Sequence, residues 1–134
     1  MVMIKTALRI FRTALAAIAL ATASVADNVP RVTDLTDESG DRVPLRTMIP
    51  AYPEIARRDR IEGEVQVCFN VDRKGKPYRI AVRKSTNRVF ERPATRAIRA
   101  SMYRALPPGI KPSGIKTCRT FRFHLEPDVV DDAQ

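Results

Sequence analysis

The sequence predicts an α+β fold in which two helices pack on one face of a three-stranded antiparallel sheet. Residues 62–71 and 78–83 alternate apolar and polar side chains with the period of a half-buried strand, and a turn segment joins them. Residues 94–105 place apolar side chains at helical spacing, and residues 115–125 return to the period of a strand. Strand, strand, helix and strand in one small domain lead to this fold class.

The composition points to one small domain without a metal centre. The chain has 134 residues, of which 44% are hydrophobic, 29% charged and 6% aromatic, and it has no Trp. A chain of this length holds one ordinary domain. Two Cys and one His cannot supply the four ligands of a structural zinc site, and there is no phosphate-binding loop. We therefore expect no metal, no cofactor and no small-molecule substrate.

The N-terminus has the three parts of a secretory signal. Lys5, Arg9 and Arg12 precede an uncharged run of 14 residues, Thr13–Ala26, which ends in a small-residue Ser-Val-Ala sequence. This pattern predicts a signal peptide over residues 1–26. The alternative is an uncleaved helix that anchors the chain in the inner membrane. However, 14 helical residues rise about 21 Å, less than the roughly 30 Å hydrocarbon core of a bilayer.

The remaining chain divides into a lead-in, a domain and a tail. Residues 27–49 are polar and show no periodicity, which predicts a flexible acidic lead-in. The domain covers residues 50–125 and opens with a short helix over Pro53–Arg58. Proline suits the first turn of a helix, and Glu54 lies near its positive end. Residues 126–134 form an acidic tail.

The periodicity of the strands predicts which side chains form the core. The inward-facing residues are Val65, Val67, Phe69 and Val71 in the first strand, Tyr78, Ile80 and Val82 in the second, and Phe121, Phe123 and Leu125 in the third. A turn over Asp72–Pro77 joins the first two strands. The long helix is expected to begin near Phe90–Pro93 and to end at Leu106–Gly109.

The long helix also determines the strand order. It carries the chain back, so the third strand runs antiparallel to the first and pairs beside it, which gives the order second, first, third. Cys68 and Cys118 lie on the polar face of these neighbours, and an even pair of Cys in an exported chain predicts a disulfide. The third strand, Ile115–Leu125, is then an exposed edge, and such edges are docking sites or hazards.

The charge is unevenly distributed along the chain. Residues 42–125 hold 20 basic and 6 acidic residues, whereas residues 27–41 and 126–134 each carry a net charge of −4. The open face of the predicted sheet carries four basic residues, here called the basic face: Arg79, Arg83, Lys116 and Arg122. This face either binds a polyanion of the cell envelope or is simply a solvated surface. Export makes nucleic acid the least expected partner.

The sequence does not predict an enzyme. Cys68 and His124 project to the same face and can be imagined as a thiol and its base. A disulfide and a surface imidazole account for both residues without catalysis. No pattern in the chain provides an oxyanion hole or a substrate pocket.

The ordered motifs over Pro50–Leu125 resemble the C-terminal domain of the TonB energy transducers. The family's Y-P-x-x-A opening is matched by Tyr52–Ala56, and its E-G-x-V-x-V-x-F-x-V strand by Glu62–Val71. A D-x-x-G turn follows at Asp72–Gly75, and an F-x-F motif closes the domain at Phe121–Phe123. Between the turn and the closing motif lie Val82, Phe90-Glu91 before the amphipathic helix, and Tyr103 with Pro107 at the helix end.

The resemblance implies a periplasmic protein-binding module. In this family the last strand accepts an extended segment of an outer-membrane transporter, the TonB box, and the Tyr-Pro segment lies near the same contact. The implied peptide-binding residues are Tyr52, Pro53, Ile115, Thr117, Arg119, Phe121 and Phe123. Tyr52 is equally well explained as a partly buried packing residue. Contact with the membrane is then indirect, and a homodimer formed by strand exchange is a further possible partner.

The chain also departs from the family pattern. The apolar run at the N-terminus is short and cleavable, and the 10 prolines are scattered rather than gathered in a spacer. We therefore do not expect the chain to harvest the proton gradient itself. The alternative functions are a domain that binds envelope polyanions, or a regulatory domain that occupies TonB boxes without transmitting force.

Overall fold

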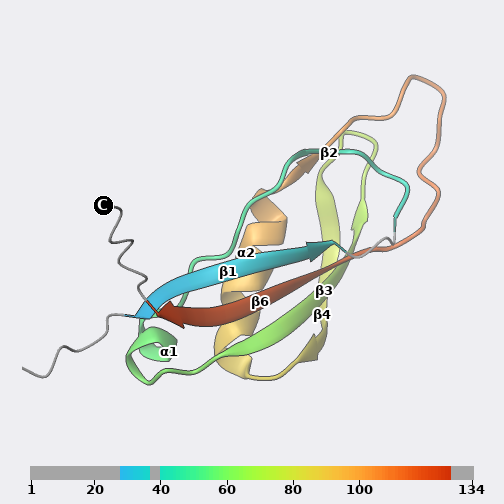
Figure 1. Ribbon diagram of the computed structural model, residues 1–134. Coiled ribbons are helices and arrows are strands. Elements are labelled where there is room, and N and C mark those ends of the chain that lie inside the picture. The colour runs from blue at the N-terminus through green and yellow to red at the C-terminus, as the bar shows by residue number, and fades with distance from the viewer. Residues whose placement is uncertain (1–27, 37–39, 128–134) are drawn as a thin grey trace, which may run out of the picture.

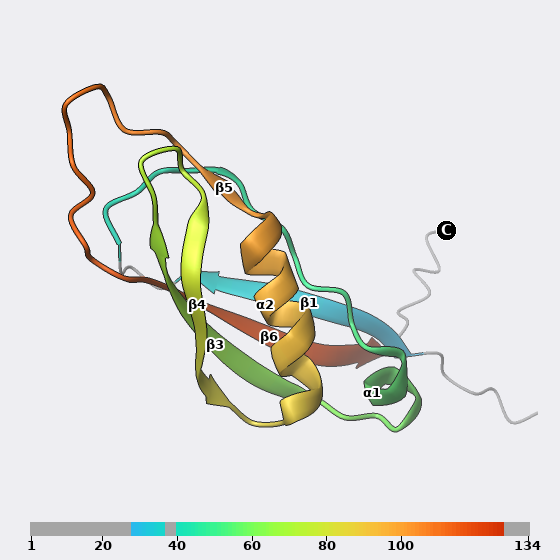
Figure 2. The same ribbon diagram turned by 180° about the vertical axis from the view of Figure 1, so that it is seen from behind.

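The computed structural model describes residues 28–36 and 40–127. Its main feature is a four-stranded antiparallel sheet in the order β1-β6-β3-β4, with one helix, α2, lying across one face (Figures 1 and 2). The strands are β1 (Asn28–Thr36), β3 (Gly63–Val71), β4 (Pro77–Ser85) and β6 (Thr117–Pro127). Two short strands, β2 (Pro44–Arg46) and β5 (Met102–Tyr103), form a second sheet.

The order of the three predicted strands is confirmed. β3 lies between β4 and β6 and is antiparallel to both, as the helical return of the chain requires. The prediction of a three-stranded sheet is wrong, however, because β1 adds a fourth strand. β1 and β2 both lie within residues 27–49, where the sequence predicted a flexible lead-in; residues 37–39 between them lie outside the described residues.

The hairpin of β3 and β4 turns sharply at Gly75. Asp72 caps the turn, since its carboxylate accepts a hydrogen bond from the Lys76 N–H at 2.8 Å. Gly75 has φ +89°, and a Cβ at this position would lie 1.9 Å from the carbonyl oxygen of Tyr103. The Tyr103 N–H donates to the Gly75 carbonyl at 2.8 Å, so only glycine fits this close approach to β5.

Two irregularities in β4 change the predicted faces of the hairpin. The pairing with β3 shifts register near Arg79 and again near Arg83. Arg79 has φ +49°, and Tyr78 lies opposite Asn70, which places it on the face away from the helix. The prediction that Tyr78 faces the core is therefore wrong, and its side chain is 40% exposed. The extra residue of a bulge breaks the alternation, so Tyr78 before it faces away from the core while Ile80 and Val82 after it pack against the core.

The predicted helices are present, but the long one is shorter than expected. α1 covers Glu54–Arg58, with Pro53 at its N-cap. A 3-10 turn, η1 (Arg88–Phe90), leads into α2 (Glu91–Ala100). α2 ends at Ser101, whose hydroxyl donates to the Ala97 carbonyl and accepts from the Met48 N–H. The chain then extends into β5, so the predicted helical residues after Ala100 leave the helix.

The core lies between α2 and the inner face of the sheet. Phe90 and Phe123 stack with ring centroids 4.3 Å apart, and Val65, Val67 and Phe121 are fully buried around them. The remaining buried apolar residues of this cluster are Ala56, Phe69, Val71, Ala94, Ile98 and Tyr103. In residues 28–36 and 40–127, no helix is long and apolar enough to cross a membrane.

Candidate functional site

The candidate site is the side of β6 that faces away from β3. The sequence predicted this side to be an exposed edge, and the structure shows instead that β1 pairs with it from Arg119 to Pro127 (Figure 1). The register runs from Asn28 opposite Pro127 to Thr36 opposite Arg119. The strand next to β3 therefore already carries an added antiparallel strand, which comes from the same chain.

Val32 and Asp34 of β1 make contacts on the inner face of the sheet. Val32 lies opposite Phe123 and packs, partly buried, against the core cluster. Two residues later, on the same face, the Asp34 carboxylate forms an ion pair with the Arg119 guanidinium. The side chains of Arg119 and Asp34 are only 12% and 15% exposed. A charge pair this far from solvent depends on both partners, because either charge alone would be desolvated without compensation.

Arg119 lies beside Tyr103 from β5. Burial raises the pKa of Tyr103, and the nearby Arg119 opposes this rise by favouring the phenolate. The other ion pair between β1 and β6, Arg31 with Glu126, has side chains that are 60% and 45% exposed. Exposed pairs of this kind contribute little to stability. The specific electrostatic contact between the two strands is thus the Asp34–Arg119 pair.

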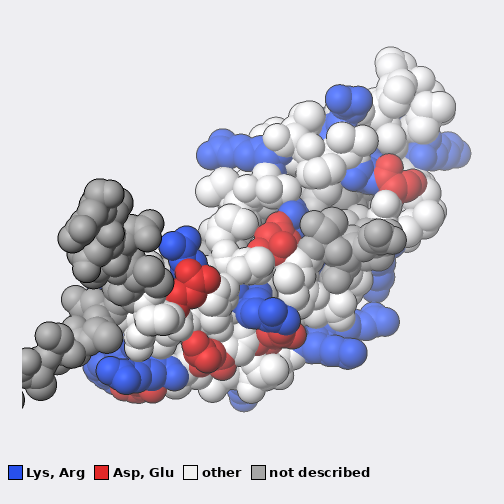
Figure 3. All heavy atoms as spheres, viewed as in Figure 1, with Lys and Arg blue, Asp and Glu red and all other residues white. Residues whose placement is uncertain are grey.

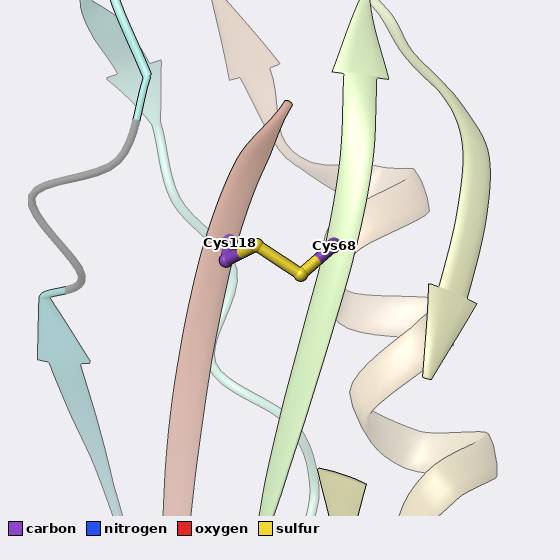
Figure 4. The surroundings of a disulfide bond; sticks show 2 residues. All are labelled: Cys68 and Cys118. Carbon is purple, nitrogen blue, oxygen red and sulfur yellow. A yellow bond between two sulfur atoms is a disulfide. The ribbon is translucent and has the colours of Figure 1, made fainter. Parts of the chain in front are cut away.

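The predicted disulfide is confirmed. Cys68 of β3 and Cys118 of β6 lie directly opposite in register, and their sulfur atoms are bonded (Figure 4). The bond crosses the face of the sheet opposite α2 and fixes the site strand to the centre of the sheet. It also consumes the thiol that a Cys68–His124 catalytic pair would need. The His124 Nε2 instead lies 3.0 Å from the Glu126 carboxylate.

The structure brings most of the predicted peptide-binding residues together on β6 or against it. Thr117, Arg119, Phe121 and Phe123 follow one another on its inner face. Tyr52 contacts Phe123 edge to face, with ring centroids 5.6 Å apart. The Tyr52 hydroxyl donates to the Ile61 carbonyl at 2.6 Å, which agrees with the packing interpretation of this residue.

Two of the predicted residues, Ile115 and Pro53, lie outside β6. Ile115 precedes the first residue of β6 and is 55% exposed, so it is not part of the strand. Pro53 occupies the N-cap of α1, at the start of the short helix that the sequence predicted over Pro53–Arg58. Asp34 was missed, because Val29, Val32 and Leu35 recur at a spacing of three, which gives no period-two signal for a strand.

The basic face also carries acidic side chains. Arg122 forms an ion pair with Glu64 of β3, and Figure 3 shows basic and acidic side chains interspersed over this side of the molecule. Arg79 and Arg83 lie at the irregular positions of β4, and Lys116 precedes β6. The face is mixed in charge over the part of the chain that the structure describes.

The chain matches one protein family and is similar to a solved structure. Residues 48–125 match the family model described as Gram-negative bacterial TonB protein C-terminal. Among solved structures, the chain is similar to the TonB C-terminal domain of Pseudomonas aeruginosa, determined by solution NMR, with 26% sequence identity and a TM-score of 0.47. That match covers 69% of this chain and 92% of the other. No curated protein matches the chain.

The family match covers more than half of the chain and contains α1, the β3–β4 hairpin, α2 and most of β6. Members of this family are protein-interaction modules rather than enzymes. The chain belongs to the family of Gram-negative bacterial TonB C-terminal domains.

Proposed function

We propose that this chain is a periplasmic protein-binding module of TonB-dependent transport, in which the TonB box of an outer-membrane transporter adds to β6 in place of β1. The observation that supports the proposal is the pairing of β6 with nine extended residues of its own chain. β1 shows by example that the outward backbone groups of β6 accept an antiparallel strand, the mode of recognition known as β-strand addition.

Replacement of β1 is energetically feasible for two reasons. β1 pairs with one strand only, at the edge of the sheet, and its side-chain contacts to the core are few. A peptide that takes its place exchanges one set of backbone hydrogen bonds for an equivalent set. The free energy of exchanging β1 for the peptide then depends on their side chains and on the effective concentration of β1. This concentration is high because β1 is part of the same chain as β6. The apparent affinity equals the intrinsic affinity multiplied by the fraction of molecules in which β1 is detached.

The predicted signal peptide gives this exchange a structural basis. Cleavage after Ala26 would start the secreted chain one residue before β1. A strand at a free chain end detaches without moving the rest of the sheet. Residues 1–27 lie outside the described residues, so the cleavage stays a prediction. Sequencing the N-terminus of the protein recovered from the periplasm tests it directly.

The experiment for the proposed function is an amide-resolved NMR titration of the secreted chain with TonB-box peptides from its own host. We expect shifts along Thr117–Pro127 and, at the same time, loss of the resonances of docked β1. Backbone pairing should persist in about 0.5 M salt, because hydrogen-bonded strands are screened far less than exposed charges. Shifts confined to the basic face and abolished by salt would replace the proposal with polyanion binding, and no shifts at all would refute it.

A further inference from the structure

The strand that occupies the site also indicates which strands the site accepts. We propose that β6 selects extended segments that carry a carboxylate at the position of Asp34, two residues after an apolar side chain at the position of Val32, and that Arg119 is the residue that makes this selection. The inference rests on the proposed function, since it concerns the segment that replaces β1.

The first step of the argument is the position of Arg119. Its side chain lies on the inner face of β6, in the same row as Phe121 and Phe123, and is 12% exposed in the presence of β1. Its ion-pair partner in the structure is Asp34, and it also interacts with the Tyr103 side chain. Arginine keeps its charge at all physiological pH values, so it cannot avoid the cost of burial by losing a proton. A replacement strand that covers it without an acid would leave a desolvated charge without a counter-ion.

The second step is the row of β1 side chains that faces the core. Val32 lies opposite Phe123, and Asp34 lies opposite Phe121, so the two side chains are neighbours on one face of the strand. The side chain at position 32 meets the aromatic rings of the core, whereas the side chain at position 34 reaches the guanidinium of Arg119. The segment that fits both the core and Arg119 therefore has an apolar residue at position 32, any residue at position 33 and an acidic residue at position 34.

The third step compares this pair with the other charged contact of the same strand. Arg31 and Glu126 also join β1 to β6, but both are about half exposed. Water and salt replace such a partner at little cost. Specificity arises where the wrong ligand leaves a buried group unpaired, and between β1 and β6 the described ion pair that meets this condition is Asp34–Arg119.

The experiment uses the full secreted chain and peptides with the sequence of β1, Asn28–Thr36, added in trans. Three peptides carry Asp, Asn or Lys at the position of Asp34 and are otherwise identical. Affinity is measured by NMR titration, so that binding along β6 is seen directly. We expect the Asp peptide to bind at least tenfold more tightly than the Asn peptide, and the Lys peptide to bind more weakly than both.

Protein variants separate selection from a merely structural role. Asp34→Asn weakens the tethered strand and should raise the affinity of the Asp peptide several-fold. Arg119→Gln removes the selecting charge and should bring the Asp and Asn peptides to within about twofold of each other. Arg31→Gln in β1 and Arg122→Gln in β6 are the matched controls, since each removes one member of an exposed ion pair, with Glu126 and with Glu64 of β3, and should leave the discrimination unchanged. If the ion pair only held β1 in place, Asp34→Asn and Arg119→Gln would change the affinity of the Asp peptide in the same direction.

The outcomes distinguish the two proposals. If peptides shift β6 but bind equally well with Asp, Asn or Lys, the selection by Arg119 is refuted and strand addition stands. If the Asp peptide is preferred but TonB-box peptides do not bind, the proposed partner is refuted while the chemistry of the site is supported. If no peptide displaces β1, both fail. Should Arg119→Gln not fold, the peptide series on the unaltered chain decides the question without it.

Discussion

The contribution of the disulfide to stability is predictable from its place in the chain. Replacing both Cys68 and Cys118 by Ala removes a cross-link between residues separated by 50 positions. The loop-entropy relation gives about 4 kcal/mol for a loop of this length at 25 °C. The described domain is small, so this is a large fraction of the free energy of unfolding, which is about 5–15 kcal/mol for typical domains.

The assay is urea denaturation of the double variant and of the unaltered chain. With an m-value of about 2 kcal/mol per molar urea, a loss of about 4 kcal/mol lowers the midpoint by about 2 M. Reduction of the unaltered chain should lower its midpoint to that of the variant, while the variant itself should not respond to the reductant. An unchanged midpoint after complete reduction would refute the reasoning, since the cross-link would then not reduce the conformational entropy of the unfolded chain.

Three further predictions test the core, a buried hydroxyl and the turn. Phe123→Ala should cost about 3–5 kcal/mol of stability, measured by thermal or chemical unfolding, because its buried ring stacks on the core; a loss below about 1 kcal/mol would contradict the packing. Tyr52→Phe should cost about 1 kcal/mol by removing a hydrogen bond. Burial, with a smaller effect of the Glu62 carboxylate, raises the pKa of Tyr52 above 10.0. The neutral phenol therefore stabilises the folded state below pH 10, and this stability is lost as the pH rises through the folded pKa. Tyr52→Phe should flatten this decline of stability at alkaline pH, and an identical pH profile in the variant would exclude Tyr52 as its source. Gly75→Ala should destabilise the domain strongly, whereas Gly109→Ala, with a similar positive φ but no neighbour within 4 Å, should show the cost of the backbone alone; equal losses would contradict the close approach to Tyr103.

The sequence predicted the parts of the fold whose patterns are local and regular. β3 and β6 were found because each alternates strictly over most of its length. The helical return of the chain predicted that they are neighbours, and the two Cys supported this order. The Tyr-Pro motif correctly marked the start of α1. In each case one periodicity or one spacing within the sequence was enough to predict the element.

The parts that were missed depend on tertiary contacts. α2 was expected to continue beyond Ala100, since Met102 and Ala105 keep the helical spacing, but the Ser101 hydroxyl and the pairing of β5 end it earlier. The prediction that Tyr78 faces inward was wrong because counting alternate residues does not reveal where a bulge interrupts the strand. β1 was missed because only the pairing with β6, and the ion pair of Asp34 with a residue 85 positions away, makes it a strand.

The bond between Cys68 and Cys118 divides the molecule into a closed ring and two open arms. The ring contains β4, α2 and β5, while β1, β2 and α1 belong to the arm that precedes it. β6 cannot be exchanged with a second molecule while the Cys118 sulfur stays bonded to Cys68 of β3 in the same chain. A domain-swapped dimer of the oxidised protein would therefore have to exchange the leading arm, with β1 of each copy completing the sheet of the other. Redox state would then decide which segments of the chain are free to be shared.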